Sequence, residues 1–285
     1  MKPIRWWLAA GLALLGCAPT RAATLAEAAQ ARLDADARAG RPLVAHVVVA
    51  LCDNQHQSIV RVPKALGNGQ DPRTNLYWGA RYGLKTYLRR DGGWQAVAHK
   101  SDAPDGVLER LVLTRRVARR GQAATAWVVA DAWDGRRIRD AIDAFLRMAG
   151  GHAIETVRVE VGGRAVALRA GGAAHLVAYV GHNGLMDFAL PRQPAPSATS
   201  PPRSAVVLAC KSQPHFGPPL RRAGAHALLL TTGFMAPEAY TLDAALKSWL
   251  AGGAPEAVGE AAAQAYHRYQ RCGLRGARRL FATGP

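Results

Sequence analysis

The chain has 285 residues, of which 49% are hydrophobic, and a formal net charge of +17. This length and apolar content exclude an intrinsically disordered chain and a small disulfide-stapled scaffold, because a core of ordinary size can form. A net positive charge of this size attracts anionic lipid headgroups, nucleic acid or acidic polymers, but no nucleic-acid-binding motif accompanies it. We favour solvated arginines as its explanation and expect no specific nucleic-acid partner.

The first 22 residues have the pattern of a signal peptide. Two basic residues precede an apolar run over 6–15, which is too short to span a bilayer. The motif Leu-Leu-Gly-Cys that ends at Cys17 resembles the bacterial lipobox, and the resemblance implies a lipid on Cys17. Alanine rather than aspartate follows, which implies sorting to the outer membrane, with the protein facing the periplasm. The alternative is an ordinary secretory cleavage near Arg21-Ala22-Ala23.

The remaining chain is predicted to form one domain, which a short helical segment precedes. Residues 23–42 are alanine-rich and predict a helical stalk or linker, and residues 43–285 predict a single α/β domain. Apolar runs typical of buried strands occupy 43–52, 107–117, 125–132, 176–180, 205–209 and 226–231. Helical patterns occupy 75–90, 136–148, 218–223, 243–250 and 256–272, an alternating hairpin pattern occupies 156–168, and a flexible proline-rich loop occupies 191–204.

The alternation of strands and helices indicates the fold class. Parallel strands need crossover connections, so strands separated by helices predict a three-layer, doubly wound and mostly parallel sheet. In such sheets the chemistry gathers where the strands end. Two of the predicted strands are followed closely by residues with reactive side chains, His182 and Cys210. A thiol attacks well only as a thiolate, and a nearby imidazole is a common way to form one.

The cysteine count bears on the compartment and on cofactors. With lipid on Cys17, three cysteines remain, Cys52, Cys210 and Cys272, and an odd number in an oxidising compartment indicates at least one free thiol. A Cys52–Cys272 bridge is one pairing that leaves Cys210 free. No cluster with metal-ligand spacing is present in the sequence, so we expect neither a metal nor another cofactor.

The order of an apolar strand ending at His182 and Gly184, followed by an apolar strand ending at Ala209 and Cys210, resembles the caspase-like cysteine peptidases. This family includes caspases, legumain, gingipains, clostripain and separase, and the likeness covers about 43–269. It implies a caspase-like sheet with a catalytic dyad of His182 and Cys210. The chain departs from the family in reading His182-Asn183-Gly184 instead of His-Gly, and in a short separation between histidine and cysteine.

The resemblance also implies roles for neighbouring residues. Backbone N–H groups of Gly184 and Cys210 are candidates for stabilising the oxyanion, and Asp53 or Asn54 for orienting the imidazole. The family selects a charged or amide side chain beside the cut. Asp187 and Glu238, together with Asp53, are acids near predicted strand ends that would favour lysine or arginine in a substrate.

The sequence therefore predicts a cysteine endopeptidase-like thiol hydrolase of the bacterial envelope, acting on a peptide or protein. Its alternative is a catalytically inactive caspase-like lipoprotein that serves as an envelope binding or scaffold module. A third possibility, a basic scaffold at the membrane surface, would need neither His182 nor Cys210.

Overall fold

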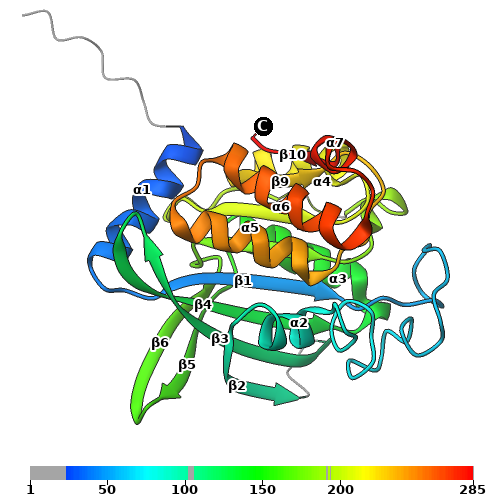
Figure 1. The fold of residues 1–285 in the computed structure, drawn as a ribbon, viewed down its shortest axis with the longest axis horizontal. Helices are drawn as coiled ribbons and strands as arrows, with labels where there is room; N and C mark the ends of the chain where they lie inside the picture. The colour runs from blue at the N-terminus through cyan, green and yellow to red at the C-terminus, as the bar shows by residue number, and fades with distance from the viewer. Residues whose placement is uncertain (1–23, 102–105, 191, 193, 285) are drawn as a thin grey trace, which may run out of the picture.

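The computed structural model describes residues 24–101, 106–190, 192 and 194–284, arranged around one large sheet (Figure 1). The strands are β1 (Leu43–Ala50), β2 (Gln95–Ser101), β3 (Val107–Arg119), β4 (Gln122–Trp133), β5 (Ile154–Val161), β6 (Arg164–Gly171), β7 (Leu176–Val180), β8 (Ser204–Leu208), β9 (His226–Thr231) and β10 (Phe281–Ala282). The helices are α1 (Leu25–Arg38), α2 (Leu84–Arg90), α3 (Ile138–Ala149), α4 (Ser212–Arg222), α5 (Ala239–Ala251), α6 (Pro255–Gln270) and α7 (Leu274–Leu280), with 3-10 turns η2 (Gly135–Arg137) and η3 (Gly184–Met186). The predicted signal segment and Cys17 lie outside the described residues.

The large sheet has the strand order β10-β9-β8-β7-β1-β4-β3-β2. Its five central strands, β9 to β4 in that order, run parallel, while β10 at one end and β3 and β2 at the other pair antiparallel. The chain crosses between parallel strands through α3 and α4, as parallel pairing requires. The hairpin β5–β6 forms a separate two-stranded sheet. The predicted α/β class with a mostly parallel sheet is confirmed.

The two faces of the sheet pack against different helices. All eight residues of β1 are buried, and successive side chains of a strand point to opposite faces. Residues 43, 45, 47 and 49 join a core with α1, α2, α5 and α6, whereas residues 44, 48 and 50 join a second core with α3 and α4. The molecule therefore has three layers, as predicted.

Helix α1 packs into the domain. Its buried side chains Leu33 and Ala37 belong to the first core, and Ala29 is also buried. Arg119 of β3, only 1% exposed, donates to Asp34 of α1 at 2.6 Å. The segment that the sequence predicted as a stalk or linker is thus joined to the sheet by apolar packing and by a buried ion pair.

The segment 75–83 forms turns, so the predicted helix over 75–90 begins only at Leu84. Asn75 is fully buried, and its side chain donates to the carbonyl of Cys52 at 2.8 Å and accepts from the Cys52 N–H at 3.1 Å. A Cβ at Gly79 would lie 2.1 Å from the carbonyl oxygen of Arg73. Side-chain hydrogen bonds to the backbone and a close chain approach therefore replace the helix here and fasten this loop to the end of β1.

The register of the sheet sets where the polar residues after the strands lie. Val180 of β7 lies opposite both Val49 of β1 and Leu208 of β8, so these three neighbouring strands end level with one another. His182 and Cys210 follow β7 and β8 within two residues. Both are consequently delivered to the same edge of the sheet.

The proline-rich connector between β7 and β8 is fastened to the turn after α3. The N–H of Ser197 donates to the carbonyl of Gly150 at 2.8 Å, and the His152 ring lies 3.1 Å from the carbonyl oxygen of Ala195. The buried Arg203 donates to the carbonyl of Ala149 at 2.7 Å. The described part of this connector is therefore packed against the second layer of helices.

Among the described residues, no helix combines the length and the apolar stretch needed to cross a bilayer.

Candidate active site

A cavity of about 520 Å³ opens at the carboxyl ends of β1, β7 and β8. Its wall contains Cys52, Gly181, His182 and Cys210 from the strand ends, and residues of the loop after β1 and of the segment between β9 and α5. The described part of the proline-rich connector contributes no residue to it. The structure thus places His182 and Cys210 in the wall of one cavity.

Asn183 joins the histidine loop to the cysteine loop. Its side chain is fully buried, donates to the carbonyl of Cys210 at 2.6 Å, and accepts from the N–H of Leu185 at 3.2 Å. The asparagine that separates His182 from Gly184 in sequence therefore holds the two loops at a fixed spacing. A buried amide with both ends satisfied is suited to this task.

The imidazole of His182 is held by an acid from its own loop. Its Nε2 lies 2.6 Å from Oδ2 of Asp187, which follows η3. The histidine side chain is 9% exposed and the carboxylate is 33% exposed. The hydroxyl of Tyr179 also donates to the His182 carbonyl at 2.7 Å. The histidine loop is thus ordered from both sides, with the carboxylate available to stabilise an imidazolium.

Cys210 lies at the point where the chain turns from β8 into α4. Its thiol lies 3.5 Å from the carbonyl oxygen of Met235, whose N–H donates to the sulfur at 3.4 Å. Lys211, the N-cap of α4, has a left-handed φ of 48°, a conformation that non-glycine residues adopt at some cost. At the start of α4, the sulfur is therefore held by the backbone of Met235.

No direct hydrogen bond joins the sulfur to the imidazole within the described residues, and the two groups face a shared space. Catalytic contacts are often long before substrate binds, so this arrangement is compatible with a pair that acts on a bound carbonyl.

The backbone donors near the sulfur differ in their availability. The Gly184 N–H donates to the His182 carbonyl at 3.1 Å inside a tight turn. A Cβ on Gly184 would lie 2.6 Å from the ring of Phe188, which explains why glycine stands there. The N–H of Cys210 has no acceptor among the described residues. Of the two donors expected from the sequence, only that of Cys210 is available to an oxyanion here.

Asp53 and Asn54 hold the loop after β1. The buried Asp53 carboxylate accepts from Gln70 at 2.7 Å and lies 2.9 Å from Nδ1 of His56. Burial would raise the pKa of Asp53, but hydrogen bonds from Gln70, Gln55 and His56 outweigh it and lower that pKa. The Asn54 amide bonds the backbone of Val62 at 2.8 and 3.0 Å.

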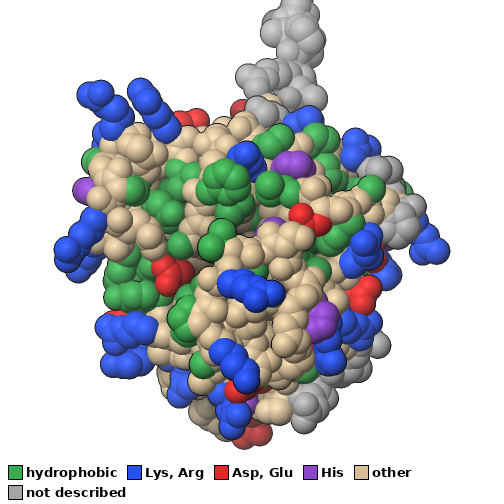
Figure 2. Space-filling view, turned by 90° about the vertical axis from the view of Figure 1, so that its right-hand side faces the viewer, with side chains coloured by type: hydrophobic (Ala, Val, Ile, Leu, Met, Phe, Trp, Pro, Cys, Tyr) green, Lys and Arg blue, Asp and Glu red, His purple; other side chains and the backbone are tan. Residues whose placement is uncertain are grey.

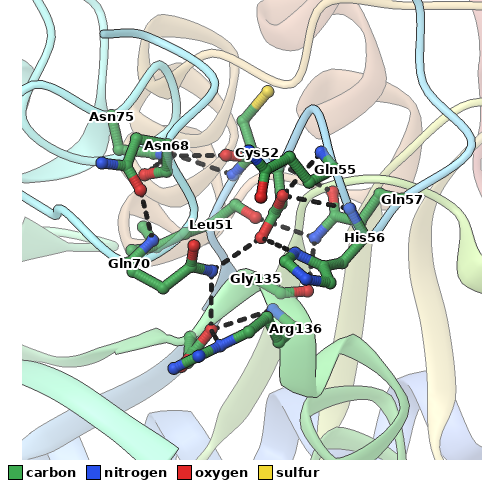
Figure 3. A network of polar contacts seen from close by, with 12 residues as sticks. Leu51, Cys52, Gln55, His56, Gln57, Asn68, Gln70, Asn75, Gly135 and Arg136 are labelled. Carbon is green, nitrogen blue, oxygen red and sulfur yellow. Dashed lines mark hydrogen bonds and ion pairs between the residues drawn. The ribbon is translucent and has the colours of Figure 1, made fainter. Parts of the chain in front are cut away.

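Figure 3 shows Gln70, His56 and Gln57 gathered at the end of β1, with Gln57 reaching the carbonyl of Gly135 at 2.9 Å. These contacts shape the loop that forms one side of the cavity. The imidazole of His182 has Asp187, rather than Asp53 or Asn54, as its hydrogen-bonded carboxylate.

The other described cysteines differ from Cys210. Cys52 lines the same cavity, but its residue is fully buried, and burial raises the pKa of its thiol to about 11. It is therefore a neutral and unreactive thiol at physiological pH. Cys272 follows α6 and is exposed. Cys52 and Cys272 are both free, so the bridge considered from the sequence is not formed in this structure.

Glu238 lies behind the cavity wall. It accepts from Tyr240 at 2.8 Å and from Gln270 at 3.0 Å, and Gln270 lines the cavity whereas Glu238 does not. Burial raises the pKa of this carboxyl group, with the two hydrogen bonds opposing the effect. Because Glu238 does not line the cavity, its carboxyl group makes no direct contact with a ligand there.

A second cluster with ligand-type side chains lies on the opposite side of β1 and is built around Arg110. His46, Asp131 and Glu155 are close enough together to hold a metal ion. The Arg110 guanidinium already bonds Asp131 at 2.6 and 2.7 Å and Glu155 at 2.7 and 3.1 Å. It therefore supplies the positive charge that a cation would bring, and this cluster functions as a structural ion-pair network joining β3, β4 and β5.

The cavity at the strand ends thus combines a thiol, an acid-supported imidazole and a backbone donor. No protein-family model, curated protein or solved structure matches the chain.

Proposed function

We propose that this chain is a cysteine hydrolase of the endopeptidase type, built on a caspase-like arrangement of strands. The observation that carries the proposal is that His182 and Cys210 follow adjacent parallel strands, line one cavity and are tied together by Asn183. The order of the strands and their terminal residues is the feature shared with caspase-like peptidases. A histidine or cysteine that served only as a buried core residue would not need the other residue in the wall of the same cavity.

The reaction uses the two side chains in sequence. The Cys210 thiol passes its proton to His182, and the sulfur attacks the carbonyl carbon of a substrate amide. The C–N bond then breaks as the imidazolium gives its proton to the leaving amine, and a thioester remains on Cys210. Water attacks the thioester with His182 as base, which releases a carboxylic acid and restores the thiol. The net reaction is hydrolysis of one amide bond.

Neighbouring groups have separate tasks in this scheme. Asp187 holds the ring of His182 and stabilises its protonated form through the 2.6 Å hydrogen bond. The Cys210 N–H is the donor for the oxyanion, where a preorganised donor is worth several kcal/mol, roughly 2.7–4 in a well-studied case. The His182 carbonyl occupies the Gly184 N–H, so that glycine acts through close packing with Phe188.

The proposal extends to the location of the protein. A lipid on Cys17 would tether it to the outer membrane, where it would face the periplasm and meet peptide or protein substrates. Because α1 begins at Leu25 and packs into the domain, such a tether would hold the domain close to the membrane surface. The net charge of +17 favours proximity to anionic headgroups.

The test is the rate at which iodoacetamide alkylates each cysteine in the native protein, followed by mass spectrometry of the peptides. We expect Cys210 to react quickly, and to react at least about tenfold more slowly in His182→Ala, because the imidazole no longer accepts the thiol proton. Cys272 is the internal reference, since it is exposed and distant in sequence. Cys52 should react only after denaturation.

A matched control is His152→Ala, which removes a histidine that contacts the proline-rich connector. This variant should leave the Cys210 rate unchanged. If Cys210 reacts equally in wild type and His182→Ala, the pair does not cooperate. That result would favour the alternative of a binding or scaffold module.

A further inference from the structure

The rim of the cavity carries an unusual share of the exposed apolar side chains. Val60 is 90% exposed, Phe234 is 69% exposed and Met186 is 39% exposed, and all three line the cavity. They are three of the five large hydrophobic side chains that are exposed in the described structure, the others being Leu25 and Ile154. They come from three separate segments: the loop after β1, η3, and the turn after β9. Their convergence on one opening indicates a surface that binds something apolar.

Figure 2 views the molecule from the side toward which β1 points. Hydrophobic side chains gather in the upper and middle part of this face, and many Lys and Arg side chains stand around its edge. This face thus combines hydrophobic side chains with many Lys and Arg side chains.

The interior of the cavity continues the character of its rim. Its further apolar lining includes Ile59, Val62, Leu76, Met235 and Pro237. A volume of about 520 Å³ is within the range of roughly 300–1,000 Å³ that ligand pockets occupy, and it accommodates a side chain as large as that of phenylalanine.

The charges near the cavity do not favour a charged substrate side chain. Among the described lining residues, Asp187 is the only carboxylate, and it is hydrogen-bonded to His182. Glu238 stands outside the lining and is bonded to Tyr240 and Gln270. A lysine or arginine side chain would therefore have Asp187 as its one carboxylate partner among the described lining residues, and would have to share it with His182. Burying a charge with an incomplete set of partners is costly.

A cation at the rim adds to this effect. The ammonium nitrogen of Lys211 lies 4.4 Å from the centroid of the Phe234 ring. It repels a second positive charge at the same opening, as does the net charge of +17 over longer distances. An acidic side chain has no lysine or arginine among the described lining residues to pair with inside the cavity.

The geometry points to a specificity for a bulky apolar side chain, such as leucine, methionine or phenylalanine, on the acyl side of the bond that is cleaved. This side chain remains in the cavity while the acyl group is attached to Cys210, with Val60, Met186 and Phe234 covering it. The inference rests on the proposed hydrolase function. It differs from the preference for lysine or arginine that the acidic residues predicted from the sequence alone.

The test uses peptidyl chloromethyl ketones that share one peptide sequence and differ only in the residue next to the ketone: leucine, phenylalanine, arginine or aspartate. The sulfur of Cys210 attacks the chloromethyl carbon, so that a C–S bond forms as the C–Cl bond breaks and chloride leaves. His182 accepts the thiol proton and passes it to solvent. We expect the leucine and phenylalanine reagents to modify Cys210 about 10- to 100-fold faster than the arginine and aspartate reagents. Each rate is divided by the iodoacetamide rate at Cys210, which requires no side-chain recognition.

The rim is tested with Val60→Ser and Phe234→Ala, which should lower the preference for leucine over arginine severalfold. Ile154→Ser is the matched control, because Ile154 is also an exposed β-branched residue but does not line the cavity. It should leave the preference unchanged. An unchanged preference in both rim variants would overturn the role given to Val60 and Phe234.

The outcomes separate the specificity from the function. If iodoacetamide labels Cys210 in a His182-dependent manner but the arginine or aspartate reagent reacts fastest, the apolar specificity is wrong and the hydrolase proposal stands. If the labelling does not depend on His182, the function fails and the specificity fails with it.

Discussion

The carboxylate of Asp187 contacts His182 at the mouth of the cavity through a 2.6 Å hydrogen bond. It is only five positions further along the chain, and η3 bends the chain back so that the two side chains meet. From the sequence, Asp187 was a candidate for binding a basic substrate side chain. In the structure it contacts the imidazole through Oδ2, where it orients the ring.

We therefore expect Asp187→Asn to lower the His182-dependent alkylation rate of Cys210 by about 10- to 100-fold, because the amide keeps the shape but not the charge. Asp187→Glu should recover part of the rate. Asp140→Asn is the control, because it changes an exposed acid of α3 that pairs with Arg137. A normal rate in Asp187→Asn, with unchanged thermal unfolding, would remove Asp187 from the mechanism.

His175 is a second residue whose contacts have a measurable consequence. Its Nδ1 accepts from the N–H of Val44 at 3.1 Å, and its Nε2 lies 2.8 Å from Asp36 of α1. These two contacts suit the neutral ring with its proton on Nε2. Burial, with a contribution from the positive charge of Arg32, lowers the pKa of His175 to about 4 despite its hydrogen bond to Asp36.

This pKa predicts the direction of a pH effect on stability. Between pH 6.5 and about 4, the unfolded chain binds a proton at His175 that the folded protein does not bind. The free energy of unfolding should therefore fall as the pH is lowered through this window, by up to about 3 kcal/mol from this residue. Urea unfolding of wild type and His175→Gln at pH 7 and pH 4.5 measures the difference. Equal losses of stability in both proteins would contradict the prediction.

At the scale of elements, α1 determines where the domain begins. Leu33 is fully buried against the sheet, whereas Leu25 at the start of the helix is 49% exposed. If α1 is part of the folded unit, Leu33→Ala should lower the free energy of unfolding by about 2–5 kcal/mol through lost burial and a residual cavity. Leu25→Ala should change it by less than about 0.5 kcal/mol. A small effect of Leu33→Ala would instead indicate a separate stalk.

Some elements could be predicted from the sequence because their local pattern agrees with their tertiary position. The strands β1, β7, β8 and β9 are predominantly apolar, and each is buried on both faces. Helix α3 buries one apolar face, and the hairpin β5–β6 turns at the two glycines expected there. In these cases the hydrophobic period alone is sufficient.

Other elements depend on contacts between distant parts of the chain. The strand β2 is an edge strand with mostly exposed residues, and nothing in its composition marks it. The two-residue strand β10 exists only through pairing with β9. In the segment 75–83, the buried hydrogen bonds of Asn75 override a helical pattern. Local periodicity carries no information about such contacts.

The same distinction applies to the candidate site. His182 and Cys210 could be identified because each directly follows a recognisable strand. The tie through Asn183 and the contact of the sulfur with Met235 could not, since both join loops that meet only in the fold. The character of the cavity also depends on three segments from different parts of the chain, so the sequence alone did not indicate its apolar rim.

At the scale of the whole molecule, one edge of the sheet concentrates the features discussed above. The level ends of β1, β7 and β8 bring together a thiol, an imidazole and an apolar opening, and the ion-pair network of Arg110 lies on the other side of β1. In doubly wound sheets, ligands bind outside the carboxyl ends of the strands, where the order of connections reverses. Here that reversal lies at β1, from which the chain goes first to β2, β3 and β4 on one side and later to β7 on the other.

The most direct measurement is the digestion of a peptide library by the intact protein and by its Cys210→Ala and His182→Ala variants, with mass spectrometry of the new termini. We predict that wild type cuts after leucine, methionine or phenylalanine and that both variants are inactive. Cuts by wild type without this preference would remove only the specificity. The absence of cutting by wild type, or the same cuts by Cys210→Ala, would contradict the account that His182 and Cys210 act together as a hydrolytic pair.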